Sequence, residues 1–475
     1  MFRSFSIRNY RLYATGEFIS LIGIWMQFVA QDWLVLQLSG NSGTALGLVA
    51  ALQFLPITLL ALYGGKLADR YDKRRMLIAA NVIWGVLAAT LAVLVLTGGV
   101  RLWHIYVLAT LFGTVNAIEM PVRQSFVGEL VRTDLLPNAL SLSSATFNSA
   151  RIVGPAVAGL GIAWFDVGPV FAVNVLTYVA PVVTLMMMRP ADLHRSAKPA
   201  QHGGIVDGLR YVRERFDLVL PIAMVGVVAM LGYNFQLTLA VMSKTVFDRG
   251  AASFGVLTSM LAVGALCGAL MGARRKSRPS ANVVLGGALA FGVLETLLAF
   301  SPTYLTMTLL LFPTGFAMIY FAQACNQRVQ MGVASEYRGR VMALYSLVFA
   351  GTVPIGATVI GWLAEHVSVR SSIYVGGLAS IVVAVAGALV MLRRTDTPIA
   401  VVIPMAINMG STSLPVNTVR RLRLAWGRNR APHRGTRRRP NGLGDIARPA
   451  TQEGLARRRP SQVSGRRKRQ PSRPH

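Results

Sequence analysis

The chain has 475 residues, of which 53% are hydrophobic and only 14% are charged. Soluble domains carry about a quarter charged residues, so this composition excludes a soluble globular protein. The formal net charge is +29, but residues 411–475 alone hold 18 bases and 2 acids, so more than half of the excess belongs to the C-terminal segment. The charge is therefore not evidence for a nucleic-acid-binding fold.

Apolar runs of about twenty residues recur along the chain, which is the length a helix needs to cross the hydrocarbon core of a bilayer. The runs are continuous rather than alternating, so they favour helices over the strands of a membrane barrel. The sequence predicts an all-α membrane protein with twelve transmembrane helices, at about Tyr13–Leu38, Ala45–Tyr63, Met76–Leu96, Leu102–Met120, Ala139–Trp164, Pro169–Met188, Asp217–Met242, Phe254–Met271, Val283–Phe300, Tyr304–Gln323, Met342–Trp362 and Ile373–Leu392.

Basic residues are distributed unevenly among the predicted connections. One alternate set is rich in Lys and Arg: residues 66–75, 123–132, 189–215, 274–278 and 328–340. The other set holds only Arg101, Lys244, Arg249 and Arg370. Short connections rich in Lys and Arg stay in the cytoplasm, so we expect a multi-pass protein of the inner (cytoplasmic) membrane with both termini in the cytoplasm.

The N-terminal and C-terminal halves of the chain share a weak internal sequence repeat. A loose echo roughly 200 residues apart relates Pro121–Gln124, Leu136–Leu140 and Gly154-Pro155 to Asn326–Arg328, Gly339–Leu344 and Val353–Gly356. We expect two six-helix halves, at residues 1–188 and 217–394. A cytoplasmic linker with an amphipathic helix should join them at residues 189–216, and a basic disordered tail should follow at residues 395–475.

The run Gly65–Arg75 combines a Gly, an isolated acid and a cluster of bases between two predicted spans. Gly lets helices approach closely, and bases hold such a segment at the anionic inner leaflet, so the run predicts a cytoplasmic gating loop. It resembles the signature between helices 2 and 3 of the major facilitator superfamily, with Asp72 where most members carry Gly. The resemblance implies the major facilitator fold and a gating role for Gly65, Asp69, Arg70 and Arg74. Glu119 and Arg123 lie about one helical turn apart at the end of span four, so we expect them to pair with each other or with this loop and to act in gating.

Two further segments narrow the resemblance. Gly154, Pro155 and Gly159 in span five are similar to the antiporter motif of drug/proton exporters, although Arg151 precedes the pair and the usual final double Gly is split. A simple packing kink would explain the same residues. The opening segment, residues 8–27, looks like the branch of enterobactin-exporter-like and macrolide-efflux-like proteins.

Charged residues inside apolar spans are costly and are therefore functional candidates. Asp32 lies on the same helical face as Trp25 and is a candidate to carry the coupled proton; a hydrated position near the outer end of the span is the alternative. Arg151, the deepest base, is the second proton-coupling candidate, and it needs an acid, carbonyls or an anionic substrate. Glu295 has no evident partner and is expected to be a packing or interface residue.

If the resemblance holds, polar and aromatic residues of spans one, four, seven and ten line a central cavity suited to bulky amphipathic molecules. The substrate-binding candidates are Trp25, Gln31, Asn116, Asn234, Gln236, Tyr320 and Gln323. The chain has no cluster of acids for a metal ion and no nucleotide-binding signature, so we expect no metal, no cofactor and no enzymatic activity. The tail would contact anionic lipid nonspecifically, without a specific nucleic acid partner.

These features predict a monomeric secondary active transporter, most consistent with a proton-coupled exporter of an amphipathic drug or metabolite such as a siderophore. Two alternatives stay open at this stage. One is an importer of the same fold, and the other is a membrane scaffold or sensor that moves nothing and acts through its basic tail.

Overall fold

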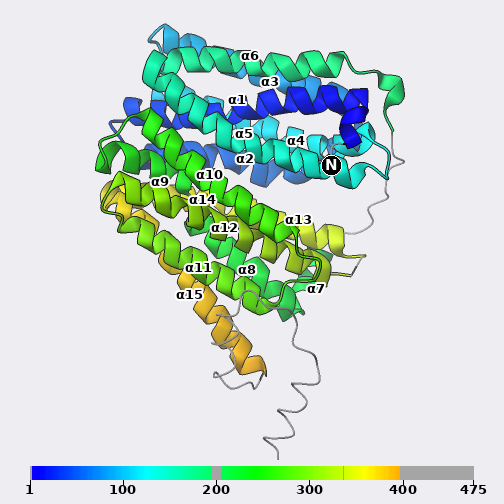
Figure 1. The fold of residues 1–475 in the computed structure, drawn as a ribbon, viewed down its shortest axis with the longest axis vertical. Coiled ribbons are helices and arrows are strands. Elements are labelled where there is room, and N and C mark those ends of the chain that lie inside the picture. Colours follow the sequence, from blue (N-terminus) through cyan, green and yellow to red (C-terminus); the bar gives the residue numbers. More distant parts are fainter. Residues whose placement is uncertain (1–2, 195–204, 335, 396–475) are drawn as a thin grey trace, which may run out of the picture. The chain divides into compact units, whose positions relative to one another are not determined.

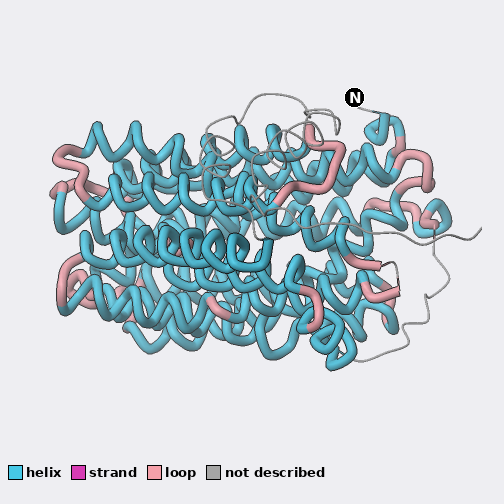
Figure 2. The backbone as a smooth tube through the Cα atoms, turned by 90° about the horizontal axis from the view of Figure 1, so that it is seen from below, coloured by secondary structure: helices cyan, strands magenta, loops and turns pink. Residues whose placement is uncertain are grey.

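The computed structural model describes residues 3–194, 205–334 and 336–395, and it leaves out the side chains of eight helical residues: Ala61, Leu62, Lys66, Asp69, Ile205, Val206, Arg394 and Thr395. The predicted tail lies outside the described residues, apart from the backbone of its first residue. Within these ranges the backbone forms helices and connections and no strand (Figure 2).

Fifteen α-helices follow one another in the described ranges (Figure 1). They are α1 (Arg8–Leu38), α2 (Gly43–Arg70), α3 (Lys73–Leu96), α4 (Leu102–Leu130), α5 (Leu136–Phe165), α6 (Val167–Met186), α7 (Ile205–Arg213), α8 (Phe216–Leu231), α9 (Phe235–Val241), α10 (Ala251–Ala273), α11 (Ala281–Ala299), α12 (Tyr304–Gly332), α13 (Arg338–Gly351), α14 (Val353–His366) and α15 (Val369–Thr395). Short 3-10 turns at Arg3–Ser6 and Pro190–Asp192, and a π-helical turn at Met242–Val246, complete the order.

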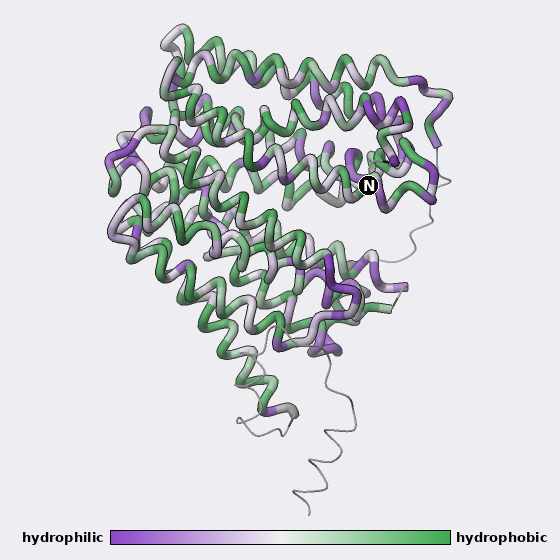
Figure 3. Tube along the Cα trace, viewed as in Figure 1, coloured by the Kyte–Doolittle hydropathy of each residue, from purple (hydrophilic) through white to green (hydrophobic). Residues whose placement is uncertain are grey.

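The predicted twelve-helix membrane fold is confirmed. In the described part of the chain, eleven segments are long and apolar enough to cross a membrane. The twelfth span is α5, whose 30 residues open with a polar stretch that lowers its hydropathy. Figure 3 shows hydrophobic residues along the helices, with hydrophilic residues concentrated at their ends.

Two spans are interrupted. Span seven was predicted as one helix, Asp217–Met242, but α8 ends at Leu231 and α9 starts at Phe235, so Gly232–Asn234 is a non-helical connection. Span eleven bends between α13 and α14, where Pro354 occupies the first turn of α14 and has no backbone N–H to donate.

Three helices run well beyond the end that the apolar pattern indicates. We expected α2 to end near Tyr63, α4 near Met120 and α12 near Gln323, yet they continue to Arg70, Leu130 and Gly332. Hydropathy reports the thickness of the hydrocarbon core, whereas a helix continues for as long as its backbone hydrogen bonds are favourable.

The two halves meet through pairs of small residues. At the start of α2, a Cβ on Gly43 would lie 2.7 Å from the carbonyl oxygen of Gly361 on α14, and one on Gly47 would overlap the carbonyl of Ala357. At the end of α5, a Cβ on Gly159 would lie 2.8 Å from the carbonyl oxygen of Ala251 at the start of α10. We call this end of the bundle, where α2 and α10 begin and α5 and α14 end, the closed end. The opposite end carries the base-rich connections and is called the basic end.

The linker helix α7 belongs to the second half. Tyr211 of α7 stacks on Tyr337, with ring centroids 4.4 Å apart, and α7 packs against α13. The sequence predicts an amphipathic piece at Gly208–Arg215, and the helix covers most of it.

Candidate functional site

Asp32 connects the two halves near the closed end. The side chain of Gln236 of α9 lies near enough to the carboxylate of Asp32 on α1 to interact with it. Oδ2 of Asp32 is buried, and it has no hydrogen-bond partner within the described ranges. Asp32 as a whole is half-buried, so both the proton-carrier role and a hydrated position stay predictions.

Trp25 and Arg151 form a second contact between α1 and α5. The guanidinium carbon of Arg151 lies 5.4 Å from the centroid of the Trp25 ring, a cation–π arrangement. Phe28 and Phe147 pack edge-on against the same indole, with centroids 5.5 and 5.9 Å away. No acid of the described residues forms an ion pair with Arg151, so its charge faces an aromatic ring in place of a carboxylate.

The span-five motif contacts α1 within the first half and α10 of the second half. A Cβ on Gly154 would overlap Trp25, which shows that this position permits the close contact of α1 and α5 within the first half. The carbonyl oxygen of Pro155 lies 2.5 Å from the Cβ position of Gly255 on α10, and Gly159 faces the same helix. The motif therefore packs against both halves.

The remaining substrate-binding candidates do not form one cluster. Gln31 is buried beside Asp32, and both polar atoms of its side chain lack a partner in the described part of the chain. Asn234 lies in the span-seven connection, where its Nδ2 donates to the carbonyl of Met230 at 2.8 Å. Asn116 is half-buried on α4.

Tyr320 and Gln323 lie on α12 next to the end of α10, which points toward the basic end. The guanidinium of Arg275 sits 3.9 Å from the centre of the Tyr320 ring. Oε1 of Gln323 contacts Gly272 so closely that no Cβ fits there, and it has no hydrogen-bond partner among the described residues. The candidates are thus distributed from the closed end to the basic end.

The predicted gating loop is mostly helical. Gly65–Arg70 completes α2 and Lys73 begins α3, so only Tyr71 and Asp72 connect the two helices. The close approach that we expected at Gly65 belongs to its neighbour: a Cβ on Gly64 would overlap the carbonyl of Ala117, whereas one on Gly65 would meet no atom within 4 Å. The side chain of Asp69 lies outside the described part of the structure.

The bases and the acid after α2 fix the start of α3. Asp72, the departure from the common signature, caps α3 by accepting a hydrogen bond from the backbone N–H of Arg75 at 3.0 Å. Arg74 donates to the carbonyls that end α6, with Nε 2.7 Å from Leu185. Arg70 is exposed and lies over the Tyr71 ring. Capping explains why an acid fits at position 72.

Glu119 and Arg123 form a buried network with Glu17 of α1. Nε of Arg123 lies 3.0 Å from Oε1 of Glu119, and its Nη1 lies 2.9 Å from Oε1 of Glu17. Glu119 is 3% exposed. The predicted pairing of Glu119 with Arg123 is present, inside α4 rather than at its end.

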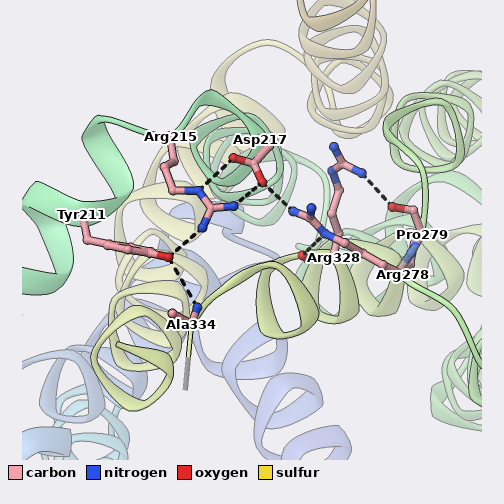
Figure 4. Close-up of polar contacts among 7 residues, drawn as sticks. All are labelled: Tyr211, Arg215, Asp217, Arg278, Pro279, Arg328 and Ala334. Atoms are coloured by element: carbon pink, nitrogen blue, oxygen red, sulfur yellow. Dashed lines mark hydrogen bonds and ion pairs between the residues drawn. The ribbon is translucent and has the colours of Figure 1, made fainter. Parts of the chain in front are cut away.

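The second half carries a comparable network that sequence reasoning missed (Figure 4). Asp217, in the first turn of α8, accepts from Arg215 at 2.9 Å and from Arg278 at 2.7 Å. Arg278 also donates to the backbone carbonyl of Arg328 on α12, and Arg328 donates to that of Pro279 in the connection before α11. Hydrogen bonds to Asp217 raise the pKa of Arg215 above its ordinary value. The available signal was the alternation of bases and acids at residues 213–217, where the second half begins.

Glu295 is the other buried acid of the second half. It is 3% exposed on α11, where we expected a packing role, and its Oε2 has no hydrogen-bond partner in the described structure. Within the described ranges no three His, Cys, Asp or Glu side chains gather as metal ligands would, and Cys267 and Cys325 are free thiols.

Comparison with known proteins identifies the class. Residues 1–412 match the family described as transmembrane secretion effector, so the chain belongs to this family of the major facilitator superfamily. It is 23% identical to the staphyloferrin A transporter of Staphylococcus aureus (strain NCTC 8325 / PS 47), over 78% of this chain and 93% of that one. It is 27% identical to the multidrug efflux pump Tap of Mycolicibacterium fortuitum, over 74% and 88% of the two chains.

The fold is also that of a solved transporter. The nucleoside transporter NupG matches with a TM-score of 0.63 and 11% identity, covering 80% of this chain and 98% of that one. The predicted membership of the major facilitator superfamily is therefore confirmed, and the chain is a multi-pass membrane transporter rather than an enzyme.

Proposed function

We propose that the chain is a proton-coupled exporter of an amphipathic drug or metabolite, such as a siderophore, that works as a monomer by alternating access. The base-rich connections all lie at the basic end, so the positive-inside rule supports a cytoplasmic position for that end and for both termini. The closed end then faces away from the cytoplasm.

One face of α5 carries the proposal. Ile152 and Gly159 lie on this face at the closed end, where the carbonyl of Ile152 accepts from Ser259 of α10 at 2.9 Å and Gly159 packs on the same helix. Helical periodicity places Asn148, Ser144 and Ser141 on the same face toward the basic end, and both serines are exposed. Exposed hydroxyl groups within a span are costly against lipid. This face therefore supports a water-filled path between the halves that is open to the cytoplasm.

The direction of transport follows from two supporting observations. The span-five segment resembles the motif of drug/proton exporters, and one relative is named a multidrug efflux pump. Asp32 is the proton carrier in this proposal, because its carboxylate joins α1 to Gln236 of the opposite half and keeps one oxygen free. A proton gained or lost there changes a contact between the two halves at the closed end.

Everted membrane vesicles test the proposal. An imposed proton gradient should drive accumulation of ethidium, used as an amphipathic probe, and Asp32→Asn should reduce the gradient-driven component by about tenfold or more, because Asn cannot titrate. Asp248→Asn is the matched control, since Asp248 is exposed in the connection before α10 and should transport normally.

The outcomes separate the alternatives. Gradient-driven loss of probe from the vesicles would indicate an importer. If neither vesicles nor cells move any of a panel of amphipathic probes, and truncation after Asp396 abolishes the cellular phenotype at normal membrane levels, the scaffold alternative replaces the transporter.

A further inference from the structure

The carboxyl group of Glu295 is enclosed at the point where span seven is interrupted. A Cβ on Gly232, the first residue after α8, would lie 2.9 Å from Oε2 of Glu295. On the other side, a Cβ on Gly376 of α15 would lie 2.8 Å from Oε1 and 2.6 Å from the carbonyl oxygen of Leu231. Both carboxyl oxygens are therefore held between two glycines and the last carbonyl of α8.

Among the described residues, no basic side chain neutralises a negative charge on Glu295. Within the described ranges it forms no ion pair with any Lys, Arg or His side chain. Tyr233 is the titratable neighbour in the connection, and its hydroxyl donates to the carbonyl of Met318 at 2.8 Å. Thr296 of α11 and Ser380 of α15 use their hydroxyls on carbonyls of their own helices.

The position also opposes a charge electrostatically. The end of a helix carries unpaired carbonyls and the negative end of the helix dipole. A carboxylate beside Leu231, buried and without a counterion, is therefore unfavourable. A protonated carboxyl group is neutral and has that carbonyl as a neighbouring acceptor.

The connection beside Glu295 leads to the part of span seven that contacts the other half. Helix α9 follows directly and packs against α1 and α2. Gln236 of α9 lies next to Asp32 of α1. Thus Asp32 lies at the contact of α9 with the first half, and Glu295 lies at the connection Gly232–Asn234 between α8 and α9, which we call the span-seven joint.

We propose that Glu295 is a second proton-binding site, located in the C-terminal half, and that its proton holds the span-seven joint in the form that keeps the closed end shut. The inference rests on the proposed function and extends it. In an exporter, the proton-loaded carrier returns toward the cytoplasm, so a protonated Glu295 belongs with the conformation described here. Loss of the proton creates a charge that requires water, and the joint must open to supply it.

Distances across the closed end test this inference without a transported substrate. Spin labels at Gln37 and Val367, both exposed at the closed end on opposite halves, report opening in a background where Cys267 and Cys325 are replaced by alanine. In the otherwise unchanged protein, reconstituted in lipid, the distance should lengthen as pH rises. Glu295→Gln, which is neutral at every pH, should keep the distance short or move the midpoint upward by about one pH unit or more. Asp248→Asn should leave the response unchanged.

Glu295→Leu provides a second neutral variant of similar size and should behave as Glu295→Gln does. If both variants open with the pH response of the unchanged protein, Glu295 is not a proton site, and the proposed function survives provided that Asp32→Asn alters the response. If the unchanged protein shows no pH response, proton coupling itself fails. Closure induced at fixed pH by replacing K⁺ with Na⁺ would overturn the proton assignment in favour of a cation site.

Discussion

Glu119 and Glu295 are equally buried acids in opposite halves of the molecule, each 3% exposed, and their surroundings differ completely. Glu119 lies 3.0 Å from the guanidinium of Arg123, which also binds Glu17. Glu295 lies between glycines beside the end of α8, with no base in reach among the described residues. The comparison teaches that burial alone does not assign a role. An acid that pairs with a base joins neighbouring helices, whereas the acid without a base is the one that we propose as a proton site.

The largest effect should come from removing the base of the first network. Arg123→Met leaves Glu119 and Glu17 without their counterion, and a buried pair broken on one side typically costs about 3–5 kcal/mol. We expect a large fall in the unfolding temperature of the purified protein in detergent. Arg123→Lys is the control and should recover part of the loss, because it restores charge without the two-armed geometry. A stability equal to that of the unchanged protein in Arg123→Met would show that the network is not structural.

Removing the acid should cost less. Glu119→Gln leaves Arg123 paired with Glu17 and keeps an amide that can still accept a hydrogen bond, so we expect a loss of about 1–3 kcal/mol. Thermal unfolding of the same preparation measures it. The double variant Glu119→Gln, Arg123→Met should be more stable than Arg123→Met alone, and an additive loss would argue against direct coupling of the two residues.

A third acid gives an intermediate case. Glu365 is exposed at the end of α14 and accepts hydrogen bonds from Oγ of Ser42 and, at 2.9 Å, from the backbone N–H of Thr44 at the start of α2. Glu365→Gln weakens a contact between the halves by about 0.5–1 kcal/mol, since exposed charged contacts contribute little. Spin-label distances across the closed end should show a small increase in the open population. No change at low salt would contradict the role of this contact.

The smallest effect on stability should be that of Glu295→Gln. Replacing an uncompensated buried carboxyl group by a neutral amide removes no ion pair, so we expect a change within about 1 kcal/mol of zero, in contrast to Glu119→Gln. The unfolding temperature at neutral pH measures this difference directly. A loss as large as that of Arg123→Met would mean that Glu295 has a counterion in the native protein.

The sequence predicted the number of spans and the pair Glu119–Arg123, because hydropathy and helical spacing are local properties. It did not predict the interruption at Gly232–Asn234, since a long apolar run contains no information about where neighbouring helices leave room for a break. It also assigned the packing role in the loop signature to Gly65 in place of Gly64. Which of two adjacent glycines faces a partner depends on the rotation of α2, which tertiary contacts decide.

The contact of Gly43 and Gly47 with Gly361 has a consequence for genetic screens. A Cβ at any of these positions would collide with backbone of the opposite half, so even alanine separates the helices. A variant library scored only by resistance or secretion would mark these positions as intolerant, as it would mark residues that touch the cargo. The library can first be restricted to variants with normal abundance in the membrane, and the remaining variants can then be compared by the volume and the polarity of the new side chain. At these three glycines, tolerance should depend on side-chain volume alone, which distinguishes them from residues that contact the cargo.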